Sequence, residues 1–207
     1  MSVEEYLRFE AESPTKHEYV DGEVYEMSGV TRRHAQIVMN ISYRLHGMAR
    51  GGPCQVIAVD VKVRPRRTRF YYPDVMVVRT PGDPDDIVVT DACFIVEVTS
   101  PSTARTDRGE KREAYLDMPA LRGYVIVDHR WRRVEWYARS ASGEWADRQV
   151  IGTGSVIVPC PETELTLDEI YEGLLLPSVR EPAADYAVDG HGTEHAPEDA
   201  AVEADVV

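Results

Sequence analysis

The sequence predicts an α/β fold in which helices flank one mixed β-sheet. Two amphipathic helical patterns, near residues 31–48 and 103–116, alternate with short apolar runs that are typical of strands. Glycine, proline and aspartate separate these segments. Hydrophobic residues make up 43% of the 207 positions, the usual share for a chain with a buried core. We therefore expect one globular domain over residues 1–177.

The first fifty or so residues predict a helix, a hairpin and a second helix. Ser2 and Glu5 have the spacing of a capping box, which favours a short helix after Ser2. The dipeptide Asp21-Gly22 lies between two strand-like segments and indicates a hairpin turn. The second helix should begin at Thr31, and one of its faces carries the apolar residues Ile37, Val38, Ile41, Leu45 and Met48.

The rest of the domain is predicted to add strands and two helices. Strand patterns occupy residues 55–64, 70–78, 94–98, 124–127, 134–138, 145–151 and 156–158. A helix should follow residue 103 and stop before Pro119. The capping box Thr166-Leu167-Asp168-Glu169 should open a last helix that runs to Leu175.

The net charge of −13 is unevenly distributed. Residues 178–207 contain eight acidic residues and one arginine, which leaves −6 for the remaining 177 residues. We expect this tail to be disordered, because it can bury too little apolar surface to offset its chain entropy. Basic residues cluster in the body, and such clusters either bind phosphate or lie in solvated turns. The clusters are Arg64, Arg66, Arg67 and Arg69; Arg105, Arg108, Lys111 and Arg112; and Arg130, Arg132 and Arg133.

The three cysteines are scattered, and no pair has the spacing of a zinc or redox site. We expect Cys54, Cys93 and Cys160 to be buried or unreactive thiols, which fits a reducing cytoplasm. No apolar run approaches the roughly 18–20 residues of a membrane span. The N-terminus is acidic where a signal peptide would be basic. The sequence therefore predicts a cytoplasmic protein with no membrane partner.

Two acidic residues in strongly apolar stretches are candidate functional groups. Glu97 lies inside the run Phe94-Ile95-Val96-Glu97-Val98, and Asp74 follows Pro73 at the start of an apolar strand. Burying a carboxylate is unfavourable unless it is compensated, and one divalent cation can compensate two carboxylates. Alternatively, Glu97 lies in water on an edge strand or pairs with an arginine, and Asp74 caps a turn.

Lys111 is the third candidate, on the helix that follows Glu97. A nuclease needs positive charge near the attacking water, and Thr99, two positions after Glu97, cannot supply it. Lys111 could reach back to the acids from its helix, although a solvated helical lysine is the ordinary alternative. Together, Asp74, Glu97 and Lys111 favour a metal-dependent nuclease.

Several short segments follow one another in a characteristic order. They are Glu18-Tyr19-Val20-Asp21-Gly22-Glu23, His34, Val59-Asp60-Val61, Pro73-Asp74, Glu97-Val98, Ser100-Pro101-Ser102-Thr103, Asp107-Arg108-Gly109-Glu110-Lys111, Tyr124-Val125-Ile126-Val127-Asp128 and Leu165-Thr166-Leu167-Asp168-Glu169-Ile170. This ordered set resembles the Uma-type restriction endonuclease family, formerly a domain of unknown function, within the PD-(D/E)XK nuclease superfamily. The resemblance covers about residues 3–175.

The resemblance implies a restriction-endonuclease-like three-layer core, with a mixed β-sheet flanked by helices. It implies that Asp74 and Glu97 bind Mg²⁺ or Mn²⁺, helped by the carbonyl of Val98. Lys111 would stand in for the superfamily lysine, displaced from the strand onto the helix.

Further candidate residues surround this set. Glu18, His34 and Asp60 are additional candidates for the site, and Arg105 and Arg108 are candidates for phosphate contact. The segment Asp60-Val61-Lys62 has the D-x-K form but precedes the Pro-Asp motif, which is the wrong order for the superfamily. We expect its polar face to border the site at most.

The predicted function is hydrolysis of DNA phosphodiester bonds by a metal-activated water. A first alternative is a nuclease fold that binds nucleic acid or a protein without cutting, which would suit the acidic body and tail. Calorimetry with Mn²⁺ would separate these two functions. A second alternative is a homodimer formed through the aromatic hairpin from Trp131 to Tyr137, which sedimentation would detect.

Overall fold

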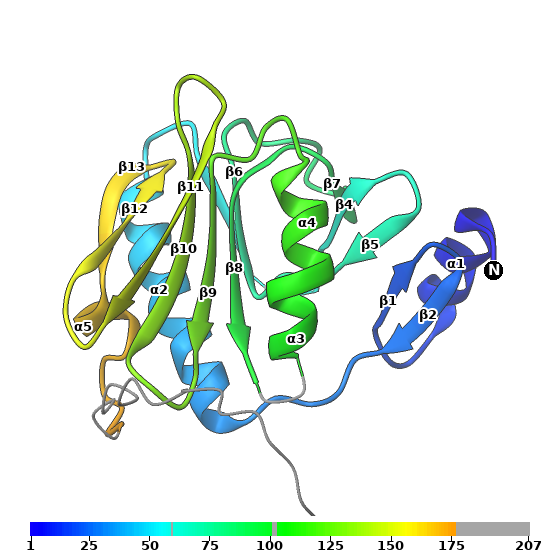
Figure 1. Cartoon of the computed structure of the whole chain (residues 1–207). Helices are drawn as coiled ribbons and strands as arrows, with labels where there is room; N and C mark the ends of the chain where they lie inside the picture. Colours follow the sequence, from blue (N-terminus) through cyan, green and yellow to red (C-terminus); the bar gives the residue numbers. More distant parts are fainter. Residues whose placement is uncertain (59, 101–102, 177–207) are drawn as a thin grey trace, which may run out of the picture.

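The computed structural model describes residues 1–58, 60–100 and 103–176. A six-stranded mixed sheet with the order β11-β10-β9-β8-β6-β3 forms its centre (Figure 1). Strands β8 and β9 run parallel, and the other neighbouring pairs in this sheet are antiparallel. The strands are β3 (Gln55–Ala58), β6 (Val75–Val78), β8 (Ala92–Thr99), β9 (Gly123–Asp128), β10 (Arg133–Arg139) and β11 (Trp145–Ile151).

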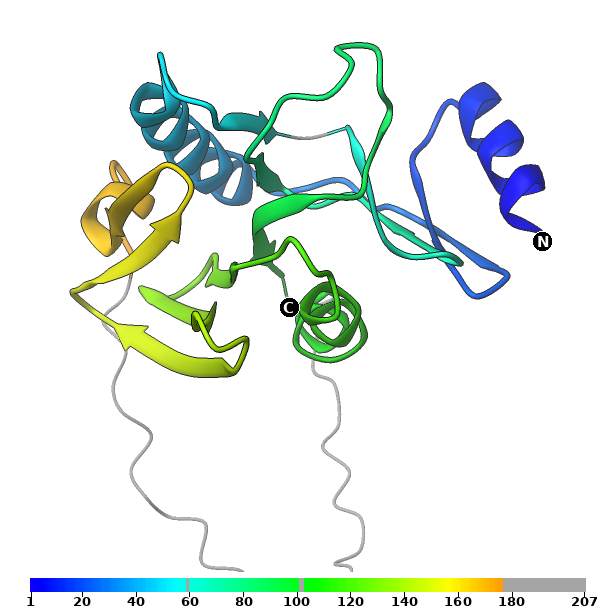
Figure 2. The same ribbon diagram turned by 90° about the horizontal axis from the view of Figure 1, so that it is seen from above.

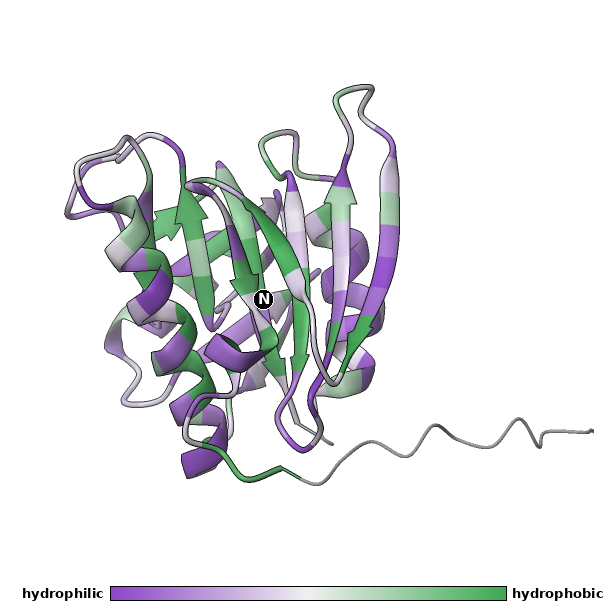
Figure 3. Ribbon diagram, turned by 90° about the vertical axis from the view of Figure 1, so that its left-hand side faces the viewer, coloured by the Kyte–Doolittle hydropathy of each residue, from purple (hydrophilic) through white to green (hydrophobic). Residues whose placement is uncertain are grey.

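Helices cover both faces of this central sheet (Figures 1 and 2). Helix α2 (Arg32–Ala49) packs on one face, and the segment α3 (Ala104–Thr106), η1 (Asp107–Lys111) and α4 (Arg112–Leu116) covers the other. Side chains alternate along each strand, so Val96 packs in the cluster with α2 while Ile95 packs in the cluster with α4. Figure 3 shows the resulting concentration of hydrophobic residues on the strands between the helices. The predicted three-layer α/β architecture is confirmed.

A second sheet, with the order β2-β1-β5-β4-β7, carries the N-terminal part of the chain. It comprises β1 (His17–Val20), β2 (Glu23–Glu26), β4 (Lys62–Arg66), β5 (Arg69–Tyr71) and β7 (Val88–Val89), and α1 (Val3–Glu12) packs against it. Ser2 caps α1 in the predicted capping box. Asp21 and Gly22 adopt φ values of 49° and 109°, the left-handed conformations that a tight hairpin turn requires.

Two segments that were predicted as single strands each divide between the two sheets. Residues 55–64 form β3 and β4, because Asp60 adopts a left-handed φ of 61° and turns the chain. Residues 70–78 form β5 and β6, because Pro73 has no N–H to donate to a strand ladder. The expectation of one sheet is therefore wrong. The chain passes from β3 of the central sheet to β4 of the second sheet, and it returns from β5 to β6. These two connections hold the sheets next to each other.

The predicted helices are present with different lengths. Helix α2 begins after its N-cap Thr31 and buries most of the predicted face, but Met48 is 42% exposed. The segment 103–116 contains a π-helical turn, η1, a feature that often marks functional sites. Helix α5 (Leu167–Ile170) has the predicted capping box but ends before Leu175, since Gly173 adopts a left-handed φ of 74°.

The C-terminal part of the described chain also contains a hairpin of β12 (Ser155–Pro159) and β13 (Glu162–Thr166). Strand β13 was not predicted, because its sequence is mostly Glu and Thr. The predicted acidic tail, residues 178–207, lies outside the described residues, so the boundary at residue 177 stays a prediction. Among the helices of the described ranges, none is long and apolar enough to cross a membrane.

Cys54 and Cys160 form a disulfide, which contradicts the expectation of free thiols. The bond joins residues 106 positions apart, one just before the edge strand β3 and the other between β12 and β13. Their spacing in the sequence gave no signal, because only the tertiary structure brings them together. Cys93 is free and buried, as predicted, and burial raises the pKa of its thiol to about 11.

Removing this disulfide should lower the free energy of unfolding by about 2–4 kcal/mol, because the cross-link restricts the unfolded chain. Urea denaturation of Cys54→Ser under oxidising conditions measures the change. A reductant should lower the stability of the parent to that of the variant and leave the variant unchanged. Equal stability of the oxidised parent and the variant would contradict the prediction.

Candidate active site

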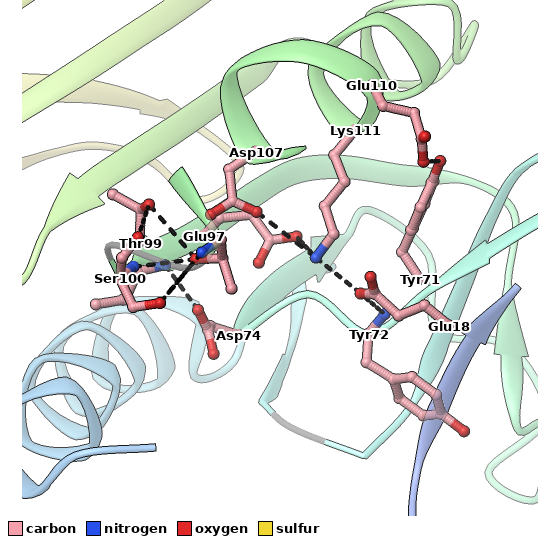
Figure 4. A network of polar contacts seen from close by, with 12 residues as sticks. Glu18, Tyr71, Tyr72, Asp74, Glu97, Thr99, Ser100, Asp107, Glu110 and Lys111 are labelled. Carbon is pink, nitrogen blue, oxygen red and sulfur yellow. Dashed lines mark hydrogen bonds and ion pairs between the residues drawn. The ribbon is translucent and has the colours of Figure 1, made fainter. Parts of the chain in front are cut away.

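Asp74 and Glu97 meet in one cavity beside the end of the central sheet (Figure 4). Strands β6 and β8 pair Val75 with Val96, so Asp74, one position earlier, comes opposite Glu97. Both side chains line a cavity of about 770 Å³. The structure therefore brings the two predicted acids to the same side of the sheet.

Asp74 is held by donors from two other elements. The Val98 amide of β8 donates a hydrogen bond to Asp74 Oδ2 at 2.6 Å. Nε2 of His34, in the first turn of α2, lies 2.8 Å from Asp74 Oδ1. Because an ionised carboxylate only accepts hydrogen bonds, His34 is the donor in this pair. These two contacts fix the orientation of the carboxylate.

Glu97 is more deeply buried and is held from the helical side. Its Oε1 accepts a hydrogen bond from the Tyr115 hydroxyl at 2.9 Å and lies 3.3 Å from Lys111 Nζ. Glu97 is 4% exposed and Lys111 is 6% exposed, so their charges are largely removed from water. The predicted reach of Lys111 back to Glu97 is present in the structure.

Lys111 contacts two further carboxylates. Its Nζ lies 2.7 Å from Glu18 Oε1 and 3.7 Å from Asp107 Oδ1. Glu18 comes from β1 of the second sheet, and its Oε1 also accepts a hydrogen bond from the Tyr72 amide at 3.3 Å. Lys111 thus bridges the two sheets (Figure 4).

We call Lys111 and the carboxylates that contact it the acid–lysine cluster; these carboxylates are Glu18, Glu97 and Asp107. The charges in this cluster are not balanced, since the carboxylates outnumber the single ammonium. Burial raises the pKa of the Glu97 carboxyl well above its ordinary value; Lys111 opposes this rise, and the charges of neighbouring acids add to it. Burial alone would lower the pKa of the Lys111 ammonium, but the surrounding carboxylates raise it further than burial lowers it. Burial and the charge of Glu97 raise the pKa of Tyr115 as well, so its hydroxyl stays protonated and donates.

Asp107 and Tyr115 are members of the cluster that sequence reasoning missed. The segment Asp107-Arg108-Gly109-Glu110-Lys111 contributed to the family resemblance, but no role was predicted for Asp107, and nothing was predicted for Tyr115. Their spacing around Lys111, four residues on either side, is the signal that could have found them, because positions four apart share a helix face.

The other predicted site residues fall into two groups. Glu18 and His34 line the cavity, as described above. Asp60 lies exposed in the turn between β3 and β4 and is not among the described residues that line the cavity. Arg108 Nε donates to Glu135 Oε1 at 2.6 Å, whereas Arg105 is exposed on α3, next to the cavity-lining Thr106. Phosphate contact by either arginine stays a prediction.

The acids of the cavity suit a hard divalent cation by their chemistry. Within the described ranges, no group of three or more His, Cys, Asp or Glu side chains is arranged to hold a metal ion. Mg²⁺ is commonly held by only one or two carboxylates, with water and substrate phosphate as the other ligands. Among the described residues, Asp107 Oδ1 is buried without a hydrogen-bond partner, although it lies 3.7 Å from Lys111 Nζ, so this oxygen can still accept a ligand. The residues present therefore fit such an ion.

The fold and the site define a nuclease-like α/β protein with a buried acid–lysine cluster. The family model of Uma2, described as "Putative restriction endonuclease", matches residues 3–169. The chain belongs to this family. The predicted family resemblance is confirmed, with nearly the predicted boundaries.

Two relatives and one solved structure are similar to this chain. Protein slr1290 of Synechocystis sp. is 32% identical over 176 residues, which cover 84% of this chain and 93% of that protein. Protein sll1609 of the same organism is 27% identical over 161 residues, covering 76% and 91%. The crystal structure of a "putative nuclease belonging to DUF820" from Anabaena variabilis has a TM-score of 0.69. The match covers 82% of this chain and 97% of the Anabaena chain. Because the two sequences are only 14% identical, the match supports the fold alone.

Proposed function

We propose that this chain is a metal-dependent nuclease that hydrolyses phosphodiester bonds of DNA. The supporting observation is the buried Lys111 ammonium, 3.3 Å from Glu97 Oε1, in the cavity that Asp74 also lines. Phosphodiester hydrolysis needs acids that hold a divalent cation and a positive group that offsets charge on the phosphate. Membership of a restriction endonuclease family supports the same activity.

In this proposal, Asp74 and Glu97 would hold Mg²⁺ or Mn²⁺, and the Val98 carbonyl would be a further ligand. The ion, when bound, polarises the phosphodiester and lowers the pKa of a bound water. His34 and the Val98 amide keep the Asp74 carboxylate oriented for this task.

Lys111 acts on the reacting groups in this scheme. It orients the attacking water and offsets the negative charge that develops on the phosphate. Tyr115 holds the Glu97 carboxylate in place from the same helical segment. The reaction needs no covalent enzyme intermediate, since water is the nucleophile.

Incubation with plasmid and with single-stranded DNA in the presence of Mn²⁺ tests the proposal. The parent should cut, and EDTA should abolish cutting. Asp74→Ala and Glu97→Ala should each reduce the rate by about 10²- to 10³-fold, the usual loss when a group that stabilises transition-state charge is removed.

The matched controls are Asp91→Ala and Glu12→Ala, which remove exposed acids. Both should cut like the parent. Equal cutting by the parent, Asp74→Ala and Glu97→Ala would reject the site, because any nuclease activity would then lie elsewhere or come from a contaminant.

A second candidate function is a module that binds nucleic acid or a protein without cutting. It is favoured by one observation: Asp74 and Glu97 already accept hydrogen bonds from the protein's own donors. Calorimetry that detects no binding of Mn²⁺ would support this function. A homodimer formed through the hairpin of Trp131 stays a prediction, although Trp136 in that hairpin is only 9% exposed and packs in the core.

A further inference from the structure

The mouth of the active-site cavity carries exposed apolar side chains. Tyr25, Met27 and Val30 line the cavity and are 55%, 38% and 62% exposed. They belong to β2 and to the segment that connects β2 with α2. Large apolar side chains grouped at the entrance of a polar cavity indicate a surface for an apolar part of a ligand.

The hairpin register places Tyr25 next to the charged cluster. Tyr25 pairs with Glu18 across β1 and β2, so the two side chains share one face with Cβ atoms about 5 Å apart. Glu18 in turn lies 2.7 Å from Lys111 Nζ. Glu18 therefore lies between the Tyr25 ring and the Lys111 ammonium, the group that is proposed to contact the substrate phosphate.

The cavity offers little of what a DNA duplex requires. Duplex binding depends on many contacts between phosphates and Lys or Arg side chains. Among the described residues that line the cavity, Lys111 is the only lysine or arginine, and carboxylates surround it. Unpaired strands are instead held largely by stacking of their bases on aromatic side chains.

We propose that Tyr25, with Met27 and Val30, forms a base-binding subsite for an unpaired nucleic acid strand. A base stacks on the Tyr25 ring while the adjoining phosphate enters the cavity toward Lys111 and Glu97. The preferred substrate is therefore single-stranded. This inference rests on the proposed nuclease function for the position of the phosphate, but the base contact is separately measurable.

Fluorescence anisotropy with a labelled oligothymidine, in Ca²⁺ and in EDTA, measures binding by the full chain. The parent should bind this probe more tightly than a labelled blunt duplex. Tyr25→Ala should weaken binding of the oligothymidine by about 5- to 150-fold, and Tyr25→Phe should keep it. The control is Tyr43→Ala, which removes a tyrosine of α2 that is 71% exposed and lies outside the cavity lining.

The outcomes separate this inference from the nuclease proposal. Loss of binding in Tyr25→Ala but not in Tyr43→Ala supports the subsite, even if the parent does not cut DNA or cuts it no faster than Asp74→Ala and Glu97→Ala. Tighter binding of the duplex, no binding of the oligothymidine by the parent, or equal binding by Tyr25→Ala and the parent would overturn the subsite. In each of these cases, the cleavage assay on the acid variants still decides the nuclease proposal.

Discussion

Lys111→Met should lower the free energy of unfolding by about 3–5 kcal/mol, the usual effect of removing one partner from a buried ion pair. The substitution preserves the apolar stem and removes the only ammonium in contact with Glu18, Glu97 and Asp107 among the described residues. The carboxylates would then be left uncompensated in a buried place. Urea denaturation at neutral pH measures the loss.

Lys62→Met is the matched control, because Lys62 is also 6% exposed. Its Nζ donates to the Tyr72 hydroxyl at 3.1 Å, and that hydroxyl itself donates to Glu10 Oε1. Burial is the main cause that lowers the pKa of Lys62, so its charge is held less favourably than that of Lys111. Its replacement should cost about 1 kcal/mol.

A double variant sharpens this test. Glu18→Gln combined with Lys111→Met removes one of the carboxylates that the lysine compensates, so the loss should be smaller than the sum of the single losses. Additive losses, or a loss in Lys111→Met no larger than in Lys62→Met, would show that Lys111 does not compensate this cluster.

Glu97→Gln should have the opposite effect on stability while it abolishes cutting. The glutamine side chain keeps an oxygen that accepts from Tyr115 and Lys111, but it removes a buried charge whose pKa is raised well above the ordinary value. Because a raised pKa means that the ionised carboxylate opposes folding, we expect the variant to be more stable than the parent at neutral pH. Cleavage with Mn²⁺ should fall by about 10²- to 10³-fold.

The gain in stability should depend on pH. A carboxyl whose pKa is raised by folding has no penalty below its unfolded pKa, 4.5, because both states are then protonated. As the pH rises, the unfolded chain ionises first, and stability is lost until the pH passes the folded pKa. The difference between Glu97→Gln and the parent should therefore be smaller at about pH 5 than at about pH 8.

Glu12→Gln, at an exposed position, is the control and should match the parent at both pH values. A Glu97→Gln protein less stable than the parent at the higher pH would show that the lysine compensates the carboxylate fully. That result would also remove the argument that the site holds surplus negative charge.

Local signals were sufficient to predict an α/β fold with helices flanking a mixed sheet, and most helix starts, whereas the three-layer core was implied by the family resemblance. The capping residues Ser2, Thr31 and Thr166 each stand where a helix begins, and Asp21-Gly22 forms the predicted turn. What could not be predicted depends on tertiary structure. The alternation of residues 55–64 continues through the turn at Asp60, so nothing local reveals that the strand changes sheets.

The site shows the same division between local and tertiary information. Glu97 was identifiable because an acid in an apolar strand is locally inconsistent. Lys111 followed only from the need for a cation, since no fixed spacing links it to Glu97. The Cys54–Cys160 bond arises from packing between elements far apart in the sequence. Asp107, in contrast, contacts Lys111 four residues away in the same helical segment, so a local signal for its role was present.

The arrangement of the two sheets has a consequence for where the chain can be divided. A truncated fragment beginning at α2 would keep every strand of the central sheet, because these strands all follow residue 49. It would nevertheless lose Glu18 and the part of the cavity wall that β1 and β2 provide. The N-terminal hairpin is thus required for a complete acid–lysine cluster, even though the central sheet contains no strand from it.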